Sequence, residues 1–383
     1  MKRTVAIIGA TGSIGKQALD VIRSDKDNFE IVLATCNRDI KSLLNIAEEW
    51  NIRTIGLHSP LEETNKASDI KVLLGNREIS SWIMDRTIDT LIFCPSGVNA
   101  FEVLRDSFKS FKRISIASKE IIVLSYISGL LENIKSKNLL MPIDSEHVAI
   151  HQLLNKINLS EIKKLIITAS GGPIYSKAEI DEDLSWVTPE IALRHPTWRM
   201  GNKVTIDSAT LFNKGIEIME AKYLFGIPEN KIEVLIHIES IIHALLELND
   251  GFVLAEMAVP DMHLPIQYSL YYPEERKTLF NKCLDFINLG KLTFRNIDPK
   301  RIGSIRLAYE ALRLGNIYPA TYITADEVAV YEFLSGRLSF NNITNLVSET
   351  LEVVKPFDNI NPFNIIELCN EIKSKSKEIM KRL

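Results

Sequence analysis

The chain of 383 residues is longer than a single ordinary hydrophobic core supports, so two or three domains are expected. Hydrophobic residues make up 46% and the formal net charge is −4, which gives a nucleic-acid partner no electrostatic support. The four cysteines form no CxxC pair, which argues against a disulfide framework or a thiolate zinc site. No uninterrupted apolar run is long enough to span a membrane and no signal or transit peptide is evident, so we expect a cytoplasmic protein.

Residues 4 to 145 alternate short aliphatic runs with helical stretches. Apolar runs buried on both faces, alternating with amphipathic helices, predict a parallel, doubly wound sheet. We therefore expect an N-terminal Rossmann-like domain over residues 1–145. Its expected strands are TVAIIG, FEIVLAT, TIGLH, TLIFC and RISIAS.

The rest of the chain predicts a different organisation. Residues 146–272 mix strands with fewer helices, which is typical of an α+β domain, and the expected strands are KLIITAS, KVTID, EVLIHI and GFVLAEMAV. Residues 273–300 are less periodic and are interpreted as a linker, with a strand or two. Residues 301–383 predict a helical C-terminal domain, so the fold class as a whole is α/β.

Three glycines lie between the first expected strand and the first helix, in GATGSIG. Gly9, Gly12 and Gly15 permit a tight turn and a close approach to the backbone. The N-terminus of the following helix offers free N–H groups and a partial positive charge to a pyrophosphate. The pattern is GxxGxxG rather than GxGxxG, so a structural turn without a ligand stays an alternative to a dinucleotide site.

The end of the second expected strand is where a dinucleotide site meets the adenosine ribose. There the chain reads Asn37, Arg38 and Asp39. A guanidinium suits a 2′-phosphate, so this pattern favours NADP over NAD. A solvated surface arginine is the alternative interpretation of Arg38.

Two carboxylates follow the last strand of the first domain, in PIDSEH. If Asp144 to Glu146 is extended, these side chains share one face, and Glu217 can supply a third oxygen ligand. Three carboxylates without a cysteine suit Mg²⁺ or Mn²⁺. The alternative is that Asp144 and Ser145 only cap the next helix. His147 and His151 lack the glutamate of HExxH, so they are interpreted as structural histidines.

Residues 207–225, DSATLFNKGIEIMEAKYLF, predict one long helix that is apolar on nearly every side. Asn213, Lys214 and Glu217 nevertheless share one narrow stripe of it, beside a glycine that weakens a helix. A serine at the start of this helix, Ser208, and Ser170 in a strand-to-SGGP turn add hydroxyls. These groups together suit a phosphate ester. A plain turn at Ser170 and an N-cap at Ser208 are the simpler alternatives.

Residues 194–203, RHPTWRMGNK, follow neither helical nor strand periodicity. Such a loop, carrying His195 and Trp198, is predicted to close over a substrate as a lid and exclude water. Trp198 alternatively anchors the loop to the core.

These motifs together resemble the 1-deoxy-D-xylulose 5-phosphate reductoisomerase family. The resemblance runs in order through GATGSIG, ASKE, PIDSEHVAI, ASGGPI, RHPTWRMG, DSATLFNKGIEIMEA, EVLIHIESIIHALLE, VPDM and ATYITADEVAV, so it covers essentially the full length. It implies an NADPH-dependent enzyme of the non-mevalonate isoprenoid pathway. That enzyme rearranges 1-deoxy-D-xylulose 5-phosphate, a phosphorylated sugar, with a divalent metal and reduces the product to 2-C-methyl-D-erythritol 4-phosphate. The resemblance also implies a homodimer, and no membrane partner.

The resemblance further implies a role for each matching residue. Catalytic roles fall on Lys119, Glu146 and His195, and the metal ligands are Asp144, Glu146 and Glu217. The cofactor-binding residues are Thr11, Gly12, Ser13, Ile14, Asn37, Arg38, Asp39, Ser118, Glu120 and Gly201. The substrate-binding residues are Lys119, Ser145, Glu146, Ser170, His195, Trp198, Ser208, Asn213, Lys214 and Glu217.

The chain departs from the family pattern at a few positions. Ser118 stands where the family commonly has asparagine, and Thr197 stands in the lid where asparagine is usual. The end of the second strand reads Asn37-Arg38-Asp39 where Gly-Lys/Arg-Asn is usual.

Two rival functions come from other classes. A reductase related to aspartate-semialdehyde dehydrogenase needs a cysteine nucleophile, for which Cys94 is the only candidate. An NADP-sensing protein without catalytic activity is the second rival, but a sensor has no need of three metal carboxylates.

Overall fold

The computed structural model describes residues 1–59, 69–98, 100–175, 183–195, 198, 200–274, 277–280, 282–297 and 302–383. The chain forms two compact units with interleaved segments. The first contains residues 1–121, 129–148 and 261–281, and the second contains residues 122–128, 149–260 and 282–383. The domain limits expected from the sequence stay a prediction.

A seven-stranded parallel sheet forms the centre of the first unit, in the order β4-β3-β2-β1-β5-β6-β7. Its strands are β1 (Arg3–Ile8), β2 (Phe29–Cys36), β3 (Thr54–Leu57), β4 (Lys71–Leu74), β5 (Ile88–Phe93), β6 (Phe111–Ile116) and β7 (Leu139–Pro142). The doubly wound sheet expected from the aliphatic runs is thus confirmed. β7 is the strand expected before PIDSEH, and β4 extends the sheet beyond the strands predicted.

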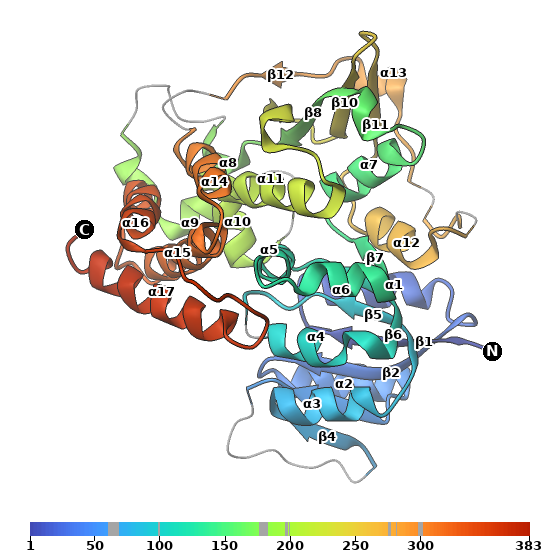
Figure 1. Ribbon diagram of the computed structural model, residues 1–383. Helices are drawn as coiled ribbons and strands as arrows, with labels where there is room; N and C mark the ends of the chain where they lie inside the picture. Colours follow the sequence, from blue (N-terminus) through green and yellow to red (C-terminus); the bar gives the residue numbers. More distant parts are fainter. Residues whose placement is uncertain are drawn as a thin grey trace. The chain divides into compact units, whose positions relative to one another are not determined.

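Helices cover both faces of this sheet (Figure 1). One face packs against α1 (Ser13–Arg23), α2 (Ile40–Trp50) and α12 (His263–Tyr271), whose apolar side chains join those of β1 and β2 in one core. The other face carries α3 (Gly75–Met84), α4 (Phe101–Ser107), the 3-10 helix η1 (Phe108–Ser110) and α6 (Leu130–Lys137). α12 comes from a distant part of the sequence, and its Leu270 and Tyr271 complete that core.

The order of the strands reverses at β1. The chain proceeds from β1 to β2 and β3 on one side and from β5 to β6 and β7 on the other. In open α/β sheets the crevice at such a switch point, beyond the carboxyl ends of the strands, is the usual ligand site. The glycine turn after β1 lies there, against the backbone of Cys94 and Pro95 after β5.

The second unit contains a five-stranded mixed sheet in the order β11-β10-β8-β9-β12. β8 and β9 pair in parallel, whereas β10 pairs antiparallel with both β8 and β11, and β12 with β9. The strands are β8 (Ile162–Ala169), β9 (Ile232–His237), β10 (Ile242–Leu248), β11 (Val253–Met257) and β12 (Phe294–Arg295). This sheet bears out the α+β character expected of the central region.

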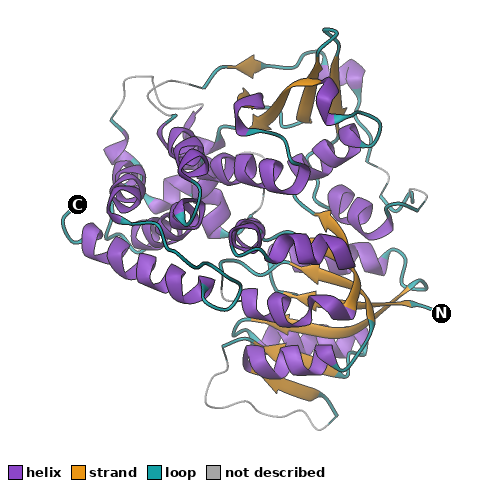
Figure 2. Cartoon of the chain, in the orientation of Figure 1, coloured by secondary structure: helices purple, strands orange, loops and turns teal. Residues whose placement is uncertain are grey.

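Helices make up most of the remaining second unit (Figure 2). They are α8 (Gly172–Tyr175), α9 (Pro189–Ala192), α10 (Asn202–Thr210), α11 (Phe212–Phe225), α13 (Phe286–Leu289), α14 (Gly303–Leu314), α15 (Tyr318–Leu334), α16 (Phe340–Val353) and α17 (Ile365–Met380), with the 3-10 helices η2 (Leu159–Glu161), η3 (Leu184–Trp186) and η4 (Glu229–Lys231). α5 (Lys119–Ile127) and α7 (Ser145–Leu154) each have residues in both units. Among the helices that the structure describes, none combines the length and the apolar character that a membrane crossing requires.

Two local predictions were wrong. The segment KVTID is helical, within α10, rather than a strand. The single helix expected over residues 207–225 is divided at Leu211, whose φ of 63° is left-handed. A leucine in that conformation is strained by about 1–3 kcal/mol, and its burial at 4% exposure supplies the compensating contacts.

Gly215 in α11 is explained by a neighbouring helix. A Cβ atom at this position would lie 2.1 Å from the hydroxyl oxygen of Tyr322 in α15 and 3.0 Å from the Cβ of Ala308 in α14. Tyr322 is fully buried and donates a hydrogen bond to the carbonyl of Ser304. Glycine therefore lets the C-terminal helices pack closely on α11, which outweighs its cost of about 0.5–1 kcal/mol in a helix.

We predict that Gly215→Ala destabilises the protein although alanine favours a helix. The added methyl group overpacks the contact with Tyr322, which typically costs about 1–3 kcal/mol. Urea unfolding followed by tryptophan fluorescence measures the loss. In a Tyr322→Phe background the clashing oxygen is absent, so the same substitution should cost less; an equal cost in both backgrounds would contradict the prediction.

Candidate functional site

Close backbone contacts require glycine at two positions of the turn after β1. Gly9 has a φ of +94°, and a Cβ atom there would lie 2.9 Å from the carbonyl carbon of Cys94. A Cβ atom at Gly15 would lie 2.4 Å from the carbonyl oxygen of Gly9, so Gly15 brings α1 close against the turn. α1 begins at Ser13 with Gly12 as its N-cap residue, and Gly12 and Ser13 are exposed. The first amides of α1 and the exposed turn are suited to bind an anion.

The three polar residues after β2, Asn37, Arg38 and Asp39, are all exposed. The Asp39 carboxylate accepts a hydrogen bond from the Ser42 amide, 3.1 Å away, and thereby caps α2. Hydrogen bonding by Ser42 lowers the pKa of Asp39. Asp39 thus has a structural role at the start of α2, while Arg38 lies at the same strand end.

Ser118 is buried, and its hydroxyl donates a hydrogen bond to the carbonyl of Pro95. That bond connects the end of β6 to the loop after β5. Lys119 and Glu120 follow directly, in the first turn of α5. The hydroxyl at position 118 therefore has a structural partner.

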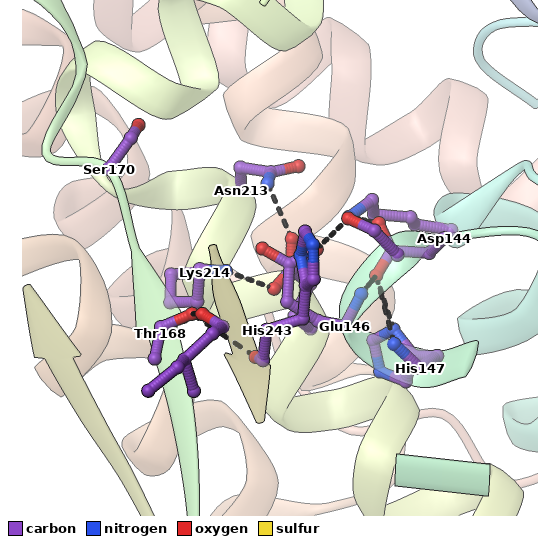
Figure 3. Close-up of polar contacts among 12 residues, drawn as sticks. Asp144, Glu146, His147, Thr168, Ser170, Asn213, Lys214 and His243 are labelled. Carbon is purple, nitrogen blue, oxygen red and sulfur yellow. Dashed lines mark hydrogen bonds and ion pairs between the residues drawn. The ribbon is translucent and has the colours of Figure 1, made fainter. Parts of the chain in front are cut away.

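Asp144 is the centre of a charged group in the first unit. Its Oδ2 lies 2.5 Å from the ammonium nitrogen of Lys119. Its Oδ1 lies 2.8 Å from Nδ1 of the fully buried His147 (Figure 3). Burial opposes ionisation of Asp144, but the charge of Lys119 and the contact with His147 outweigh it, so the pKa of Asp144 lies well below its usual range. His147 is thus a satisfied structural histidine, as expected.

Asp144 also caps α7, because its Oδ1 accepts from the amides of Glu146 and His147 at 3.1 and 3.2 Å. Asp144 is therefore the cap of α7; that it serves only as a cap stays a prediction. The premise that residues 144–146 are extended was wrong, since Ser145 and Glu146 begin α7. The Ser145 hydroxyl donates to Oε2 of Glu146 at 2.6 Å, so these two side chains lie together in the first turn.

In the second unit, α11 holds a fully buried carboxylate. The side chain of Glu217 has no exposed surface, and its two oxygens accept from Asn213 Nδ2 and Lys214 Nζ, each at 2.5 Å. The side chain of Lys214 is itself only 4% exposed. Figure 3 shows Asn213 and Lys214 directing their nitrogens toward the same side of the helix, as the three- and four-residue spacing predicted.

Ser170 and His195 meet after β8. Ser170 Oγ lies 3.0 Å from His195 Nε2 and accepts from the Gly172 amide at 3.2 Å. His195 Nδ1 accepts from the Trp198 amide at 2.9 Å, which requires the neutral tautomer with its proton on Nε2. Burial lowers the pKa of His195 to about 4.

Gly172 brings the turn after β8 against α10. Its φ is +61°, and a Cβ atom there would lie 2.9 Å from the Cα of Ala209 and 3.1 Å from the carbonyl oxygen of Ser208. Ser208 is half-buried near the C-terminal end of α10. The N-cap interpretation of Ser208 was therefore wrong, but the turn that carries Ser170 does lie beside it.

The lid expected over residues 194–203 is described in part, because Pro196, Thr197 and Arg199 lie outside the described residues. The ring of Trp198 lies 6.4 Å from that of His243 in β10, so Trp198 packs toward the sheet here. Gly201 is the N-cap residue of α10 with a φ of −64°, and an added Cβ atom would meet nothing within 4 Å. Among the residues that the structure describes, neither sterics nor backbone conformation thus requires glycine at position 201.

Sequence reasoning missed a buried ion cluster at the end of this loop. Lys203 Nζ lies 2.6 Å from Asp207 and 2.8 Å from Asp326 of α15, and both aspartates are buried. The i,i+4 spacing of Lys203 and Asp207 was the available signal, but the pair was interpreted as part of a strand. This cluster connects the start of α10 to α15.

Cys94 is poorly suited to be a nucleophile. Its thiol donates to the carbonyl of Ile8, 3.2 Å away, and burial raises its pKa to about 12. A thiolate is the reactive form, so the cysteine-dependent reductase is disfavoured.

Three family models match the chain, and they belong to one family. The model described as 1-deoxy-D-xylulose 5-phosphate reductoisomerase matches residues 5–125. The model of the 1-deoxy-D-xylulose 5-phosphate reductoisomerase C-terminal domain matches residues 140–225, and that of the DXP reductoisomerase C-terminal domain matches residues 257–379. The 1-deoxy-D-xylulose 5-phosphate reductoisomerase of Clostridium kluyveri is 38% identical over 97% of both chains.

Solved structures agree with this. The Zymomonas mobilis 1-deoxy-D-xylulose 5-phosphate reductoisomerase in complex with NADPH has a TM-score of 0.88 at 32% identity, covering all of both chains. A DOX-P reductoisomerase in complex with NADPH, fosmidomycin and magnesium has a TM-score of 0.89 at 31% identity, covering 99% of this chain and 98% of that one.

We predict that His195 stays neutral from pH 8 down to about pH 5. Its folded pKa of about 4 lies below the ordinary value of 6.5. The stability that the neutral, buried ring contributes is thus fully present above about pH 6.5 and is lost as the pH falls toward 4. NMR titration of the imidazole nitrogens, assigned with His195→Asn, measures the midpoint; a value near 6.5 would contradict the prediction.

Proposed function

The chain belongs to the 1-deoxy-D-xylulose 5-phosphate reductoisomerase family, and on this premise we propose that it converts 1-deoxy-D-xylulose 5-phosphate to 2-C-methyl-D-erythritol 4-phosphate with NADPH. The observation that carries the proposal is the largely buried polar stripe of α11, where Asn213, Lys214 and Glu217 converge in a helix whose other buried residues are mostly apolar. Burying such groups is costly and is retained where a ligand uses them.

The residues of the first unit fit a bound NADPH. The turn at Gly9 and the exposed start of α1 offer amides to a pyrophosphate, and Arg38 offers a guanidinium to a 2′-phosphate. We propose that Thr11, Gly12, Ser13 and Ile14 contact the cofactor there. No described residue of the chain sterically requires glycine at position 201, and this supports the place of Gly201 against the cofactor.

The acidic residues fit a divalent cation. Asp144, Glu146 and Glu217 are the group of carboxylates that we propose as ligands, and an all-oxygen set suits Mg²⁺ or Mn²⁺. Such a cation, when bound, polarises a ketone and makes a neighbouring hydroxyl more acidic. His147 and the amides of α7 orient Asp144 for this role.

We propose that the substrate phosphate binds in the second unit. Ser170, Ser208, Asn213 and Lys214 supply hydroxyls, an amide and an ammonium, which are the donors a phosphate ester accepts from. His195, which is neutral, donates from Nε2 to Ser170 Oγ and so directs the hydroxyl hydrogen of Ser170 toward the phosphate. Energy from this contact, remote from the reacting carbons, favours closure of the lid loop over the substrate.

Lys119 is the residue we propose to stabilise negative charge on the substrate oxygens. Its ammonium is held by Asp144 at 2.5 Å and is therefore already oriented before the substrate arrives. Ser145 and Glu146 lie side by side at the start of α7. We propose that Ser145 contacts the substrate and that Glu146 carries a proton. Trp198 would cover the bound substrate.

We further propose a cytoplasmic homodimer. All four cysteines are free, as is typical of a reducing compartment. Phe252 and Val253, at the turn between β10 and β11, are 71% and 53% exposed, which supports an apolar contact with a second copy. Analytical ultracentrifugation at micromolar protein concentration measures the oligomeric state, and a monomer would contradict the proposed dimer.

The deciding experiment follows NADPH oxidation at 340 nm with 1-deoxy-D-xylulose 5-phosphate and Mg²⁺ or Mn²⁺. We expect consumption that needs both substrate and metal, is abolished by a chelator, and is slower with NADH. A folded protein that binds NADPH but consumes none would overturn the proposal.

We predict that Glu217→Gln abolishes turnover and weakens binding of Mn²⁺, measured from the electron paramagnetic resonance signal of the free ion. It should also lower the free energy of unfolding by up to about 3–5 kcal/mol, because Lys214 keeps its charge in a buried site after losing its carboxylate.

Glu220→Gln is the matched control for this variant. Glu220 lies one turn along α11 and is equally buried, at 1% exposure. We expect the Glu220→Gln variant to bind Mn²⁺ as tightly as the wild type, even if the variant is less stable. Equal Mn²⁺ affinity in the wild type and Glu217→Gln would contradict the ligand role.

A further inference from the structure

Four polar side chains of the first unit form a chain of hydrogen bonds that the proposed function does not use. Thr35 Oγ1 lies 2.8 Å from His58 Nε2, and His58 Nδ1 lies 2.7 Å from Asn76 Oδ1. Asn76 Nδ2 in turn donates to the Glu102 carboxylate at 3.4 Å. The four residues come from the end of β2, the residue after β3, the start of α3 and the start of α4.

The direction of these hydrogen bonds follows from the chemistry of Glu102. A carboxylate only accepts, so Asn76 turns its NH₂ group toward Glu102 and its oxygen toward His58. His58 must then carry its proton on Nδ1, which leaves Nε2 as an acceptor. The hydroxyl of Thr35 therefore donates to Nε2, and the orientation of every member is determined.

The chain of hydrogen bonds ends on the glycine turn. With its hydrogen directed at His58, Thr35 Oγ1 accepts from the Gly9 amide at 3.3 Å. The carbonyl oxygen of the same threonine accepts from the amides of Gly9 and Ala10 at 3.1 and 2.8 Å. Thr35 has no exposed surface, so no solvent competes for these contacts. On its other side the turn touches the backbone of Cys94, which leaves it little freedom to move.

The backbone around His58 also fixes the end of β2. The His58 amide donates to the carbonyl of Cys36 and the Ser59 amide to that of Asn37, each at 3.0 Å. The pairing of β3 with β2 thus continues past both strands, as far as the residue before Arg38. His58 is therefore connected both to the glycine turn after β1 and to the end of β2, the two segments proposed to bind the dinucleotide.

We propose that Thr35, His58, Asn76 and Glu102 are positioning residues for NADPH, whose directed hydrogen bonds hold the Gly9–Ala10 turn and the end of β2 in the binding conformation. The inference rests on the proposed place of the cofactor at the glycine turn. Preorganisation of this kind raises affinity because the turn need not be ordered when the ligand binds.

The test compares substitutions at two buried threonines of the same sheet. Thr35→Val keeps the shape of the side chain and removes the hydroxyl, whereas Thr35→Ser keeps the hydroxyl. Thr54→Val is the matched control, since Thr54 is 6% exposed at the opposite end of β3 from His58. The dissociation constant for NADPH is measured directly, from the enhancement of nicotinamide fluorescence, and unfolding in urea is measured for every variant.

We expect Thr35→Val to raise the dissociation constant about 2- to 12-fold, the factor that corresponds to one net hydrogen bond of about 0.5–1.5 kcal/mol. Thr35→Ser should stay within about twofold of the wild type, and Thr54→Val should not change affinity. The KM for NADPH should rise with the dissociation constant, while the KM for the sugar phosphate should not. If Thr35 has a purely structural role, both valine variants should lose stability but bind NADPH with the same affinity as each other. That result would overturn the inference.

The tautomer of His58 is a second, independent measurement. The ¹⁵N shifts of the imidazole should assign the proton to Nδ1 in the wild type, and Glu102→Gln should mix the tautomers because a side-chain amide both donates and accepts. A wild-type proton on Nε2 would overturn the directed chain. A wild-type protein that bound no NADPH would overturn the proposed function as well, whereas normal NADPH binding with equal Thr35→Val and Thr54→Val affinities would overturn this inference alone.

Discussion

The buried carboxylate of Glu217 is the constraint around which the second unit is organised. A charge without exposed surface needs close partners, and Asn213 and Lys214 supply them from the same helix. Because all three groups lie on one stripe, α11 must present that stripe to a polar site and bury its other faces. The C-terminal helices complete this burial through Tyr322, which occupies the space that Gly215 leaves.

The same helix explains why the second unit extends so far along the chain. α14 and α15 lie far beyond α11 in the sequence, yet Ser304 donates to the carbonyl of Thr210, 94 residues earlier and just before α11. Tyr322 of α15 contacts Gly215 in the same way. Lys203, held between Asp207 and Asp326, connects the start of α10 to α15 in the same way. The helical C-terminal region is thus a support for the groups assigned to the phosphate rather than an independent addition.

In the first unit the corresponding constraint is the close approach of three segments at the switch point of the sheet. Gly9 lies against the backbone after β5, Gly15 brings α1 onto the turn, and Thr35 holds the turn from β2. Asp144 and Lys119 lie at the carboxyl ends of β7 and β6, on the same edge of this parallel sheet. The groups that we propose to bind ligands gather there because parallel strands all end at that edge.

Local features of the chain determined much of this protein from its sequence: the glycine turn, the alternation of strands and helices, and the polar stripe of α11 each depend on residues close together in the chain. Long-range packing decided the rest. Leu211 adopts a left-handed conformation that no leucine prefers by itself, and KVTID alternates like a strand but is helical, with Lys203 contacting Asp207 one turn away and Asp326 far along the sequence. Only the tertiary structure decided that Gly215 makes room for Tyr322 and that His58 connects Glu102 to the turn at Gly9. These contacts join segments that lie far apart in the sequence, and such a separation leaves no periodic signal.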